Sequence, residues 1–530
     1  MQAEQTRERS MWWMALPTFL VSSPLTAIAA VFMAYKMGFF IGGSALAGIV
    51  SSGFAFLIYR NRLRGAHAAN AGQTAASACG SLAGIIAVLL QTFYWIGVGD
   101  SFDLTSLALF TLCAAMFGIG VGMVYTPLLV DRMQLAYPTG RAVYEILRAM
   151  MNWCSLQRAL ASILGAGMIV GPRMAVPGLA MGLIGLLCVP SMVEVGWISA
   201  GEGFNKVAFY GGLTMMLGAA IVHIGEMLLA ARKTARKTAG EGSVVPFWVL
   251  AWTGAWLILT MVVGVTFMEL NPLFLFVGIL TAFVFVLVNG ISTGVSDANP
   301  VTGAFVLSVL AMVILVGVDN KMQALLSTSV LLISIAVGVD MQQDRSTGAR
   351  LGSDRVMQFR FQVVGVLMGL VFGFLLGPYF LGAYPELMNS DQTGGEWASV
   401  FTMKIVGGLE MIDGYKPHQI GLLISGLFLG AIMQGLRIRW RSKLEDSFVL
   451  STLVLPSPYA FALGTFLPFT MTLWFAIGGV VSTLLPKGLA VTEASDDEGP
   501  PESALPGLVG GGLVGGAGLA YLYMGFSNFF

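Results

Sequence analysis

Long apolar stretches recur along almost the whole chain. A membrane-spanning α-helix needs about 20 consecutive, mostly apolar residues. Stretches of about that length lie near residues 17–35, 40–58, 76–97, 104–127, 174–192, 205–229, 246–267, 271–290, 300–317, 322–339, 359–382, 418–436, 466–485 and 504–523. A soluble chain beyond roughly 250 to 300 residues divides into domains and does not bury this much apolar surface in one core. The pattern therefore predicts an all-α polytopic membrane protein.

Three shorter apolar pieces lie near residues 159–172, 397–411 and 449–464. Each is too short, or too interrupted by Gly and Pro, to cross a membrane comfortably. Irregular backbone at membrane depth is tolerated where it lines a cavity. We therefore expect re-entrant or broken helices here, and about 14 to 16 transmembrane helices in all, depending on how many of the pieces cross.

The composition agrees with a membrane protein and excludes other classes. Of the 530 residues, 56% are hydrophobic and 11% charged, whereas a soluble domain carries roughly 25% charged residues. The 28 Lys and Arg residues are balanced by 28 Asp and Glu residues, so the basic surface of a nucleic-acid-binding protein is not expected. The four cysteines and three histidines are scattered, which favours neither a disulfide framework nor a metal site. We expect no nucleic-acid partner, metal or cofactor.

Basic loops alternate with acidic or neutral loops. The basic loops follow the N-terminal Arg7 and Arg9 and lie at residues 60–64, 131–158, 232–237, 345–355 and 437–443. Cytoplasmic loops of membrane proteins are enriched in Lys and Arg, so this alternation predicts a multi-pass protein of the cell membrane with both termini cytoplasmic. The first apolar stretch resembles a signal peptide, but it is long enough to span, and we interpret it as an uncleaved first helix.

The chain contains signs of an internal repeat. Three sets of residues recur in the same order: Ser23-Pro24-Leu25-Thr26 with Asn299-Pro300-Val301-Thr302, Gln73 and Ser77 with Gln343 and Thr347, and Gly167, Met174 and Gly182 with Gly464, Met471 and Gly479. They predict a first transmembrane repeat over 1–244, linking helices over 245–298 and a second repeat over 299–530, with the two repeats parallel. Chance agreement is the alternative, because glycine is so common.

Polar residues at membrane depth are the candidate functional residues, because their burial in lipid is costly. The run from Asp340 through Gln343 and Asp344 adjoins the end of an apolar span, and Gln73 and Ser77 occupy the same place in the first half. A solvated loop explains the arginines of this run but not its carboxylates and amides. We expect the two segments to flank a central cavity.

Two further segments carry candidate residues. In the Asp297–Gly303 segment, Pro300 after Asn299 predicts a helix start whose free amides can meet a substrate carboxylate. The alternative is a helix start capped by its own Asp297. In the segment YPTGRAVYEIL, Glu145 either lies in an inner gate or proton path, or belongs to an ordinary cytoplasmic surface helix.

Broken helices are predicted at two more places. One contains Gly167 and Gly171, and the other contains Ser457 between two prolines. In transporters such breaks expose backbone groups at the substrate site. No catalytic motif accompanies them, so we do not expect an enzyme. The glycine-rich run at 507–518 favours close helix packing and is the sole basis for expecting a homodimer.

Six segments together resemble the oligopeptide transporter (OPT) family, which includes the yellow stripe-like metal-chelate transporters. They are QTAASACGSLAG from Gln73, YPTGRAVYEIL from Tyr137, GAGMIVGPRMA from Gly165, DANPVTG from Asp297, DMQQDRSTGARLG from Asp340 and LPSPYAFALGTFLP from Leu455. The resemblance runs from about residue 17 to 485. The chain departs from the family pattern at Ser346, where a Lys is usual, and at Met168, where an aromatic residue is usual.

The resemblance implies secondary active transport by alternating access, usually coupled to protons. The residues expected to bind substrate are Gln73, Ser77, Asn299, Pro300, Gln343, Gly167, Gly171 and Ser457. Those expected to couple protons or gate the pathway are Glu145, Asp297, Asp340 and Asp344. The partners are then a small-molecule substrate, protons and the lipid bilayer.

The substrate remains open between two classes. Short oligopeptides are the first expectation, because few basic residues other than Arg173 and Lys404 lie at membrane depth, whereas a multiply anionic chelate favours several cationic wall residues. Metal chelates of siderophore-like or nicotianamine-like type are the alternative. A channel and a membrane lipid enzyme are remote alternatives.

Overall fold

The structure is a computed structural model of the protein. It describes residues 2–36, 43–58, 62–99, 103–152, 168–201, 203–235, 245–297, 299–389, 399–414, 416–466 and 469–484, together with residues 509 and 513. Every regular element in these residues is helical, which confirms the predicted all-α class. The predicted span at 504–523 and most of the predicted broken helix at 159–172 lie outside the described residues.

Thirteen apolar helices account for the predicted spans among the described residues. Ten are long and apolar enough to cross a membrane, and three are shorter. The ten are α1 (Gln2–Lys36), α3 (Arg62–Trp95), α4 (Leu104–Thr126), α7 (Pro172–Glu194), α8 (Asn205–Ala235), α9 (Phe247–Thr266), α10 (Pro272–Ser296), α12 (Lys321–Leu351), α13 (Arg355–Ala383) and α15 (Pro417–Arg439). The three are α2 (Gly43–Ile58), α11 (Val301–Val316) and α18 (Phe469–Leu484).

Shorter elements connect or interrupt these helices. They are η1 (Pro127–Arg132), α5 (Pro138–Asn152), η2 (Pro385–Met388), α14 (Val400–Leu409), η4 (Glu410–Ile412), α16 (Arg441–Asp446), η5 (Leu450–Val454) and α17 (Pro458–Phe466). At both 397–411 and 449–464 the structure has short helices, as the interrupted apolar pattern predicts. α14 has 10 residues and α17 has 9.

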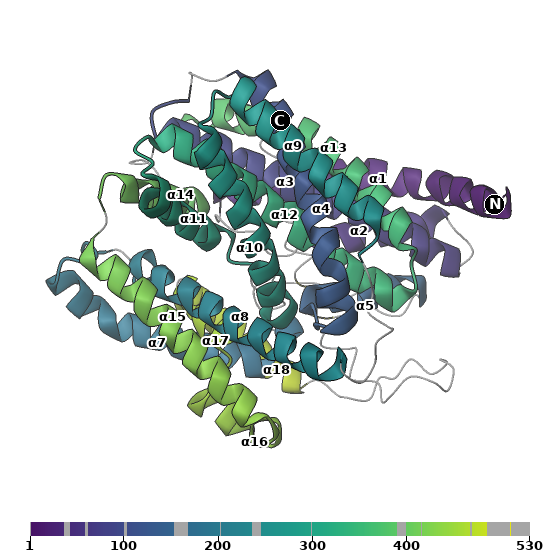
Figure 1. Ribbon diagram of the computed structural model, residues 1–530. Helices are drawn as coiled ribbons and strands as arrows, with labels where there is room; N and C mark the ends of the chain where they lie inside the picture. The colour runs from purple at the N-terminus through teal and green to yellow at the C-terminus, as the bar shows by residue number, and fades with distance from the viewer. Residues whose placement is uncertain are drawn as a thin grey trace.

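The helices form two groups (Figure 1). In the larger helix group, α3 packs against α1, α2 and α13, and α12 packs against α4 and α10. In the smaller helix group, α8 packs against α15 and α17, and α7 packs against α17 and α18. Each group takes helices from both predicted halves of the chain. The predicted repeat itself stays a prediction.

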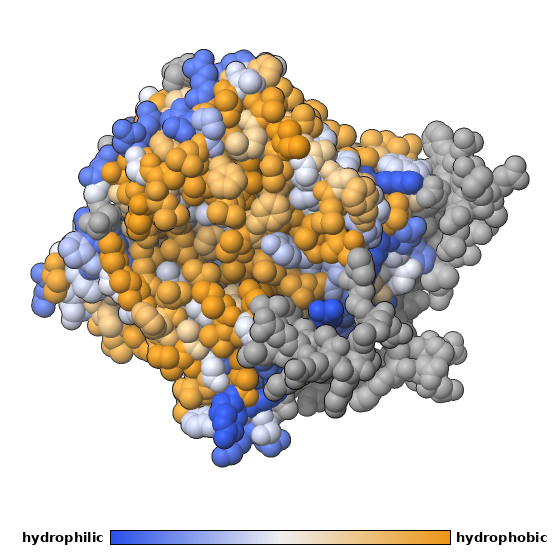
Figure 2. All heavy atoms as spheres, in the orientation of Figure 1, coloured by the Kyte–Doolittle hydropathy of each residue, from blue (hydrophilic) through white to orange (hydrophobic). Residues whose placement is uncertain are grey.

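The surface has the character of a lipid-facing protein. Figure 2 shows a broad apolar face with hydrophilic residues gathered toward its margins. In the most apolar window of α3, 94% of the residues are buried, compared with 22% in α7 and in α15. α3 is therefore central, whereas α7 and α15 expose apolar side chains such as Leu187 and Phe428. Because apolar side chains are as soluble in lipid tails as in a protein core, this exposure is stable in a bilayer.

Two central helices are longer than their apolar runs predict. α3 begins at Arg62 instead of near residue 76, and α12 continues to Leu351 instead of ending near residue 339. α12 ends where Gly352 adopts a left-handed conformation (φ 67°) and its N–H bonds to the carbonyls of Gly348 and Ala349, a common helix C-terminus. These extensions contain polar residues, so a hydropathy pattern does not detect them as helix. In the structure these polar residues include Gln73 and Asp344, which form hydrogen bonds between helices.

Glycines on α13 bring its backbone close to α3. A Cβ atom added to Gly365 would lie 2.8 Å from the Cα of Ala75, and one added to Gly369 would lie 3.0 Å from the Cα of Cys79. Gly373 meets α3 in the same way one turn later, at 3.1 Å from the Cα of Ala83. Small residues every fourth position are typical of closely packed membrane helices. This contact sets the position of α3, which carries two of the candidate residues.

Candidate functional site

A buried polar cluster joins α12 to α3. The Nε2 of Gln73 donates to Oδ1 of Asp344 at 2.7 Å, and the hydroxyl of Ser77 donates to Oδ1 of Asp340 at 2.6 Å. The relative exposure of the four residues is 8% for Asp340 and 0 to 1% for the others. The sequence predicts that these two segments flank a cavity. The structure brings the two segments into direct contact, and the cavity itself stays a prediction.

Two further side chains on other helices belong to the cluster. Ser44 of α2 lies 2.7 Å from the hydroxyl of Ser77 and 3.4 Å from Oδ1 of Asp340. Gln362 of α13 donates its Nε2 to Oδ2 of Asp340 at 3.3 Å. Both are buried, and sequence reasoning missed both. The one available signal was a Gln inside the apolar run of α13, since a buried amide in a membrane helix requires a partner.

The two carboxylates of the cluster face neutral donors. Asp340 and Asp344 are four residues apart on one helix, which puts them on the same face. Among the described residues, no Lys, Arg or His forms an ion pair with either of them, and Oδ2 of Asp344 and Oε1 of Gln73 are buried without a hydrogen-bond partner. An unpaired buried carboxylate is costly in a membrane protein and marks a site for an ion or proton.

Arg345 does not neutralise this pair, although it follows Asp344 directly. Arg345 is buried. The charged groups that interact electrostatically with it are Arg355, Asp354 and Asp131, not Asp340 or Asp344. Arg355 itself forms an ion pair with Asp131 of η1. Neighbouring residues on a helix point in different directions, so the basic residues of this segment belong to a separate network.

The first turn of α5, together with Tyr137 directly before it, is fixed to the end of α10 and to α12. The backbone N–H of Tyr137 donates to the carbonyl of Gly294 at 2.9 Å, and the N–H of Thr139 donates to Oδ1 of Asp297 at 3.0 Å. The hydroxyl of Thr139 donates to the other oxygen of Asp297. On α12, the hydroxyl of Thr347 donates to the carbonyl of Gly140 at 2.9 Å. We call these contacts the α5 latch.

Asp297 is the acceptor at the centre of the α5 latch. It ends α10 in a left-handed conformation with φ 61°, which Asp tolerates better than most residues. Burial raises the pKa of its carboxyl group, and the two hydrogen bonds from Thr139 act in the opposite direction. The alternative in which Asp297 caps its own following helix is wrong. The residue preceding α11 is Pro300, which provides no side-chain cap.

The remaining predicted residues lie apart from the two carboxylates. Asn299 is exposed and accepts from Asn289 at 2.9 Å, and Pro300 is buried at the start of α11. Gln343 is half-buried, and its carbonyl would lie 3.0 Å from a Cβ atom added to Gly140. Glu145 is half-buried on α5, which packs against α2, α3 and α12.

The predicted broken helices lie in the smaller helix group. Gly171 precedes α7 with φ 80°, a conformation that favours glycine. Ser457 is buried directly before α17, where the chain between η5 and α17 is irregular. α7 and α17 pack together, so these two segments are neighbours. Gly167 lies outside the described residues.

Lys404 of α14 links the two helix groups. Its Nζ donates to the carbonyl of Phe466 at 3.1 Å and lies 5.5 Å from the ring centroid of Phe466 and 5.7 Å from that of Phe209. Such cation–π contacts stabilise a partly desolvated ammonium group. The cation therefore has partners in α17 and α8, across the boundary between the groups.

The part of the chain that the structure describes contains no group of three or more His, Cys, Asp or Glu residues positioned to hold a metal ion. The side chains of the polar cluster are amides, hydroxyls and carboxylates. A carboxylate can take up a proton, and all three kinds of group form hydrogen bonds with polar small molecules.

Comparison with known proteins connects these features to a family. The family described as "OPT oligopeptide transporter protein" matches residues 159–528, which is more than half of the chain. The matched region includes Asp297, Asp340, Asp344 and Ser457, whereas Gln73, Ser77 and Glu145 precede it. A comparison with curated proteins finds no match. Several long apolar helices, as a membrane transporter requires, lie within the matched region. The chain therefore belongs to the OPT oligopeptide transporter family of membrane transporters.

Proposed function

We propose that the protein is a secondary active transporter that couples the inward movement of protons to uptake of short oligopeptides. The observation that carries this proposal is the pair Asp340 and Asp344, buried on one face of α12 among neutral donors. A carboxylate pair without a cation can take up and release a proton as its exposure to water changes.

In the proposed cycle, the larger and smaller helix groups move relative to one another. The boundary between them contains Lys404 of α14 and its partners Phe209 and Phe466. In the state open to the outside, a proton binds the Asp340 and Asp344 pair, and a peptide binds beside this pair at Gln73 and Ser77. After the two helix groups have moved, the proton and the peptide are released to the cytoplasm. This is alternating access in a protein with broken helices.

The α5 latch is proposed to close the cytoplasmic end of the pathway. Its bonds join α5 to the end of α10 and to α12, close in sequence to the two carboxylates. Opening this end requires that the Thr139 bonds to Asp297 break. Protonation of Asp297 weakens them, because a neutral carboxyl accepts weaker hydrogen bonds than a carboxylate.

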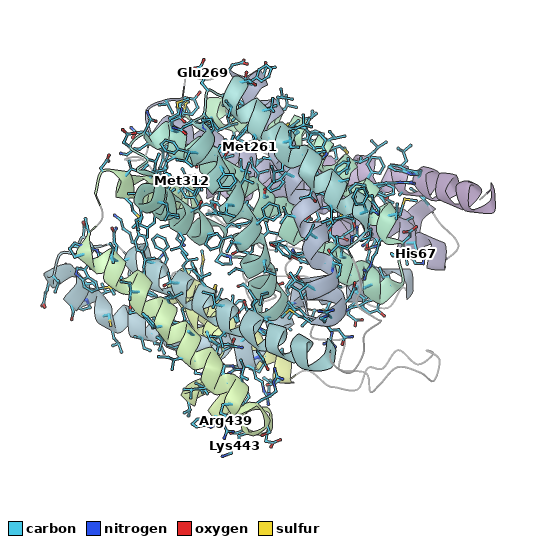
Figure 3. All side chains as sticks on the ribbon, in the orientation of Figure 1. His67, Met261, Glu269, Met312, Arg439 and Lys443 are labelled. Carbon is cyan, nitrogen blue, oxygen red and sulfur yellow. The ribbon has the colours of Figure 1, made fainter. Side chains whose placement is uncertain are left out.

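The proposed orientation places both termini in the cytoplasm of a multi-pass cell-membrane protein. In Figure 3, Arg439 and Lys443 lie at the opposite end of the molecule from Glu269. The basic end is then cytoplasmic, as the positive-inside rule requires.

Peptides fit the cluster better than chelates do. The buried side chains at Asp340 and Asp344 are acidic or neutral, and such a surface attracts the cationic amino terminus of a peptide and repels a multiply anionic chelate.

Uptake into proteoliposomes tests the proposal. A labelled mixture of tri- to pentapeptides is expected to accumulate in vesicles that contain the protein when the outside is more acidic, with saturation at high peptide concentration. Without the pH gradient, uptake is expected to stop when the peptide concentrations inside and outside the vesicles are equal. An absence of peptide uptake, with gradient-driven uptake of an iron or nickel chelate instead, would overturn the peptide assignment and favour the chelate class.

A further inference from the structure

A basic cavity lies at the end of the smaller helix group, away from the carboxylate cluster. It has a volume of about 300 Å³ and is lined by residues from α7, α8, α15, α16 and η5. The polar side chains that define it are those of Arg173, His223, Gln434, Arg437 and Arg441. The transport cycle proposed above uses none of these five side chains.

The cavity carries excess positive charge. Arg173 and Arg437 both line the cavity. Arg441 lies 3.7 Å from Glu226, and the two side chains are 64% and 29% exposed. The described side chains that line the cavity include three arginines and no Asp or Glu. Arg173 also lies in the first turn of α7, where the positive end of the helix dipole disfavours a cation. The basic lining and the N-terminus of α7 both attract an anion to the cavity.

The cavity also offers oriented hydrogen-bond donors. Nη1 of Arg437 donates to the carbonyl of Leu455 at 2.6 Å, which fixes this guanidinium at the wall. Nδ1 of His223 is buried and has no hydrogen-bond partner among the described residues. Guanidinium groups match the geometry of phosphate oxygens through paired N–H donors. The donor set therefore fits a phosphate group.

Exposed apolar residues lie close in sequence to the lining residues of the cavity. Trp440 is 41% exposed, Phe448 47%, Leu453 59% and Val454 65%. These residues lie on the same short stretch as the lining residues Arg441, Leu444 and Ser451. Tryptophan is enriched at the level of lipid headgroups. A free anion in water makes no use of such a rim, whereas a lipid contacts it with its acyl chains.

We propose that this cavity binds the phosphate of an anionic phospholipid, with the acyl chains against the apolar rim formed by Trp440, Phe448, Leu453 and Val454. Basic pockets between membrane helices on the cytoplasmic side are suited to such headgroups. The lipid bridges α7 to α15 and so stabilises the smaller helix group.

Binding of phosphatidylglycerol to the purified full-length protein tests this proposal. The protein in detergent is titrated with phosphatidylglycerol, with phosphatidylcholine and with inorganic phosphate, and bound lipid is counted by native mass spectrometry. The double variant Arg173→Gln with Arg441→Gln removes two lining charges. The matched control, Arg439→Gln with Lys443→Gln, removes two charges at the same end of the molecule that do not line the cavity (Figure 3).

The expected result is saturable binding of phosphatidylglycerol that weakens on the order of 30-fold in the lining variant, because each basic side chain contributes to anionic-lipid binding. The control variant is expected to bind like the wild type. A second lining variant, Arg173→Lys with Arg441→Lys, keeps both charges and is expected to retain most of the affinity, which distinguishes loss of charge from loss of folding.

Three results would overturn the proposal. Equal weakening in the lining and control variants would mean general attraction to a basic surface. Equal binding of phosphatidylcholine would mean that the phosphate is recognised without regard to the lipid's net charge. Saturable binding of inorganic phosphate at the same side chains, without added affinity for phosphatidylglycerol, would mean a site for a free anion. None of these measurements depends on peptide transport.

Discussion

Replacing Asp344 by Asn is expected to abolish proton-driven accumulation of peptide. For one proton per peptide, a gradient of two pH units supports accumulation of up to about 100-fold, since each pH unit corresponds to a factor of ten. The Asn variant keeps the acceptor oxygen for Gln73 but has no proton to exchange, so accumulation falls to about the outside concentration. The measurement compares the internal and external concentrations of a labelled peptide in proteoliposomes at steady state.

Exchange of peptide across the membrane separates this effect from misfolding. With unlabelled peptide inside and labelled peptide outside, the Asp344→Asn variant is expected to exchange at a rate within about threefold of the wild type, because exchange does not require net release of a proton. Asp319→Asn is the matched control, since Asp319 is exposed beyond the opposite end of α12. Full accumulation by both Asp340→Asn and Asp344→Asn would exclude this pair as the coupling site.

Replacing Gly365 by Val is expected to destabilise the larger helix group severely. The added Cβ would lie 2.8 Å from the Cα of Ala75 and even closer to its carbonyl oxygen, and backbone atoms cannot rotate away as a side chain does. Overpacking of a tight core costs about 1 to 3 kcal/mol and sometimes more, and here the whole α3–α13 contact must open. The thermal midpoint of the purified protein and its monodisperse yield measure the effect.

Gly382→Val provides the control on the same helix. A Cβ atom at Gly382 meets nothing within 4 Å, and the change in side chain is identical. We expect this variant to have a thermal midpoint close to that of the wild type. Equal losses in the Gly365 and Gly382 variants would mean that the close approach of α3 and α13 is not what stabilises the group.

The positions of the helices were largely predictable, because hydropathy reports the requirement that membrane spans be apolar. The predicted helix bounds are wrong where a helix contains polar residues that are buried against other helices, as in α3 and α12. Gln73 and Asp344 occur in helix segments that read as polar loops, since each finds its partner on another helix. A window along one chain segment contains no information about such a partner.

The composition of the site was only partly predictable for the same reason. Gln73, Ser77, Asp340 and Asp344 stand out as polar residues beside apolar runs, and the structure brings them together. Ser44 has no such signal, because a single Ser is ordinary in membrane helices.

The contacts of Asp297 show a second reason why the sequence does not predict the whole site. Its bond with Thr139 joins residues 158 positions apart, and no local pattern links them. The predicted repeat faces a related difficulty, because Pro24 lies inside α1 whereas Pro300 precedes α11, so similar residues occur in different local structures.

The most direct test of proton-coupled peptide transport is the internal pH of proteoliposomes that contain a trapped pH-sensitive dye. With no initial pH gradient and with potassium and valinomycin holding the membrane potential constant, peptide is added outside. The proposed symport predicts that the interior of wild-type vesicles acidifies as peptide enters, and that the interior of Asp344→Asn vesicles does not. Peptide entry into wild-type vesicles without any acidification would contradict the proposal.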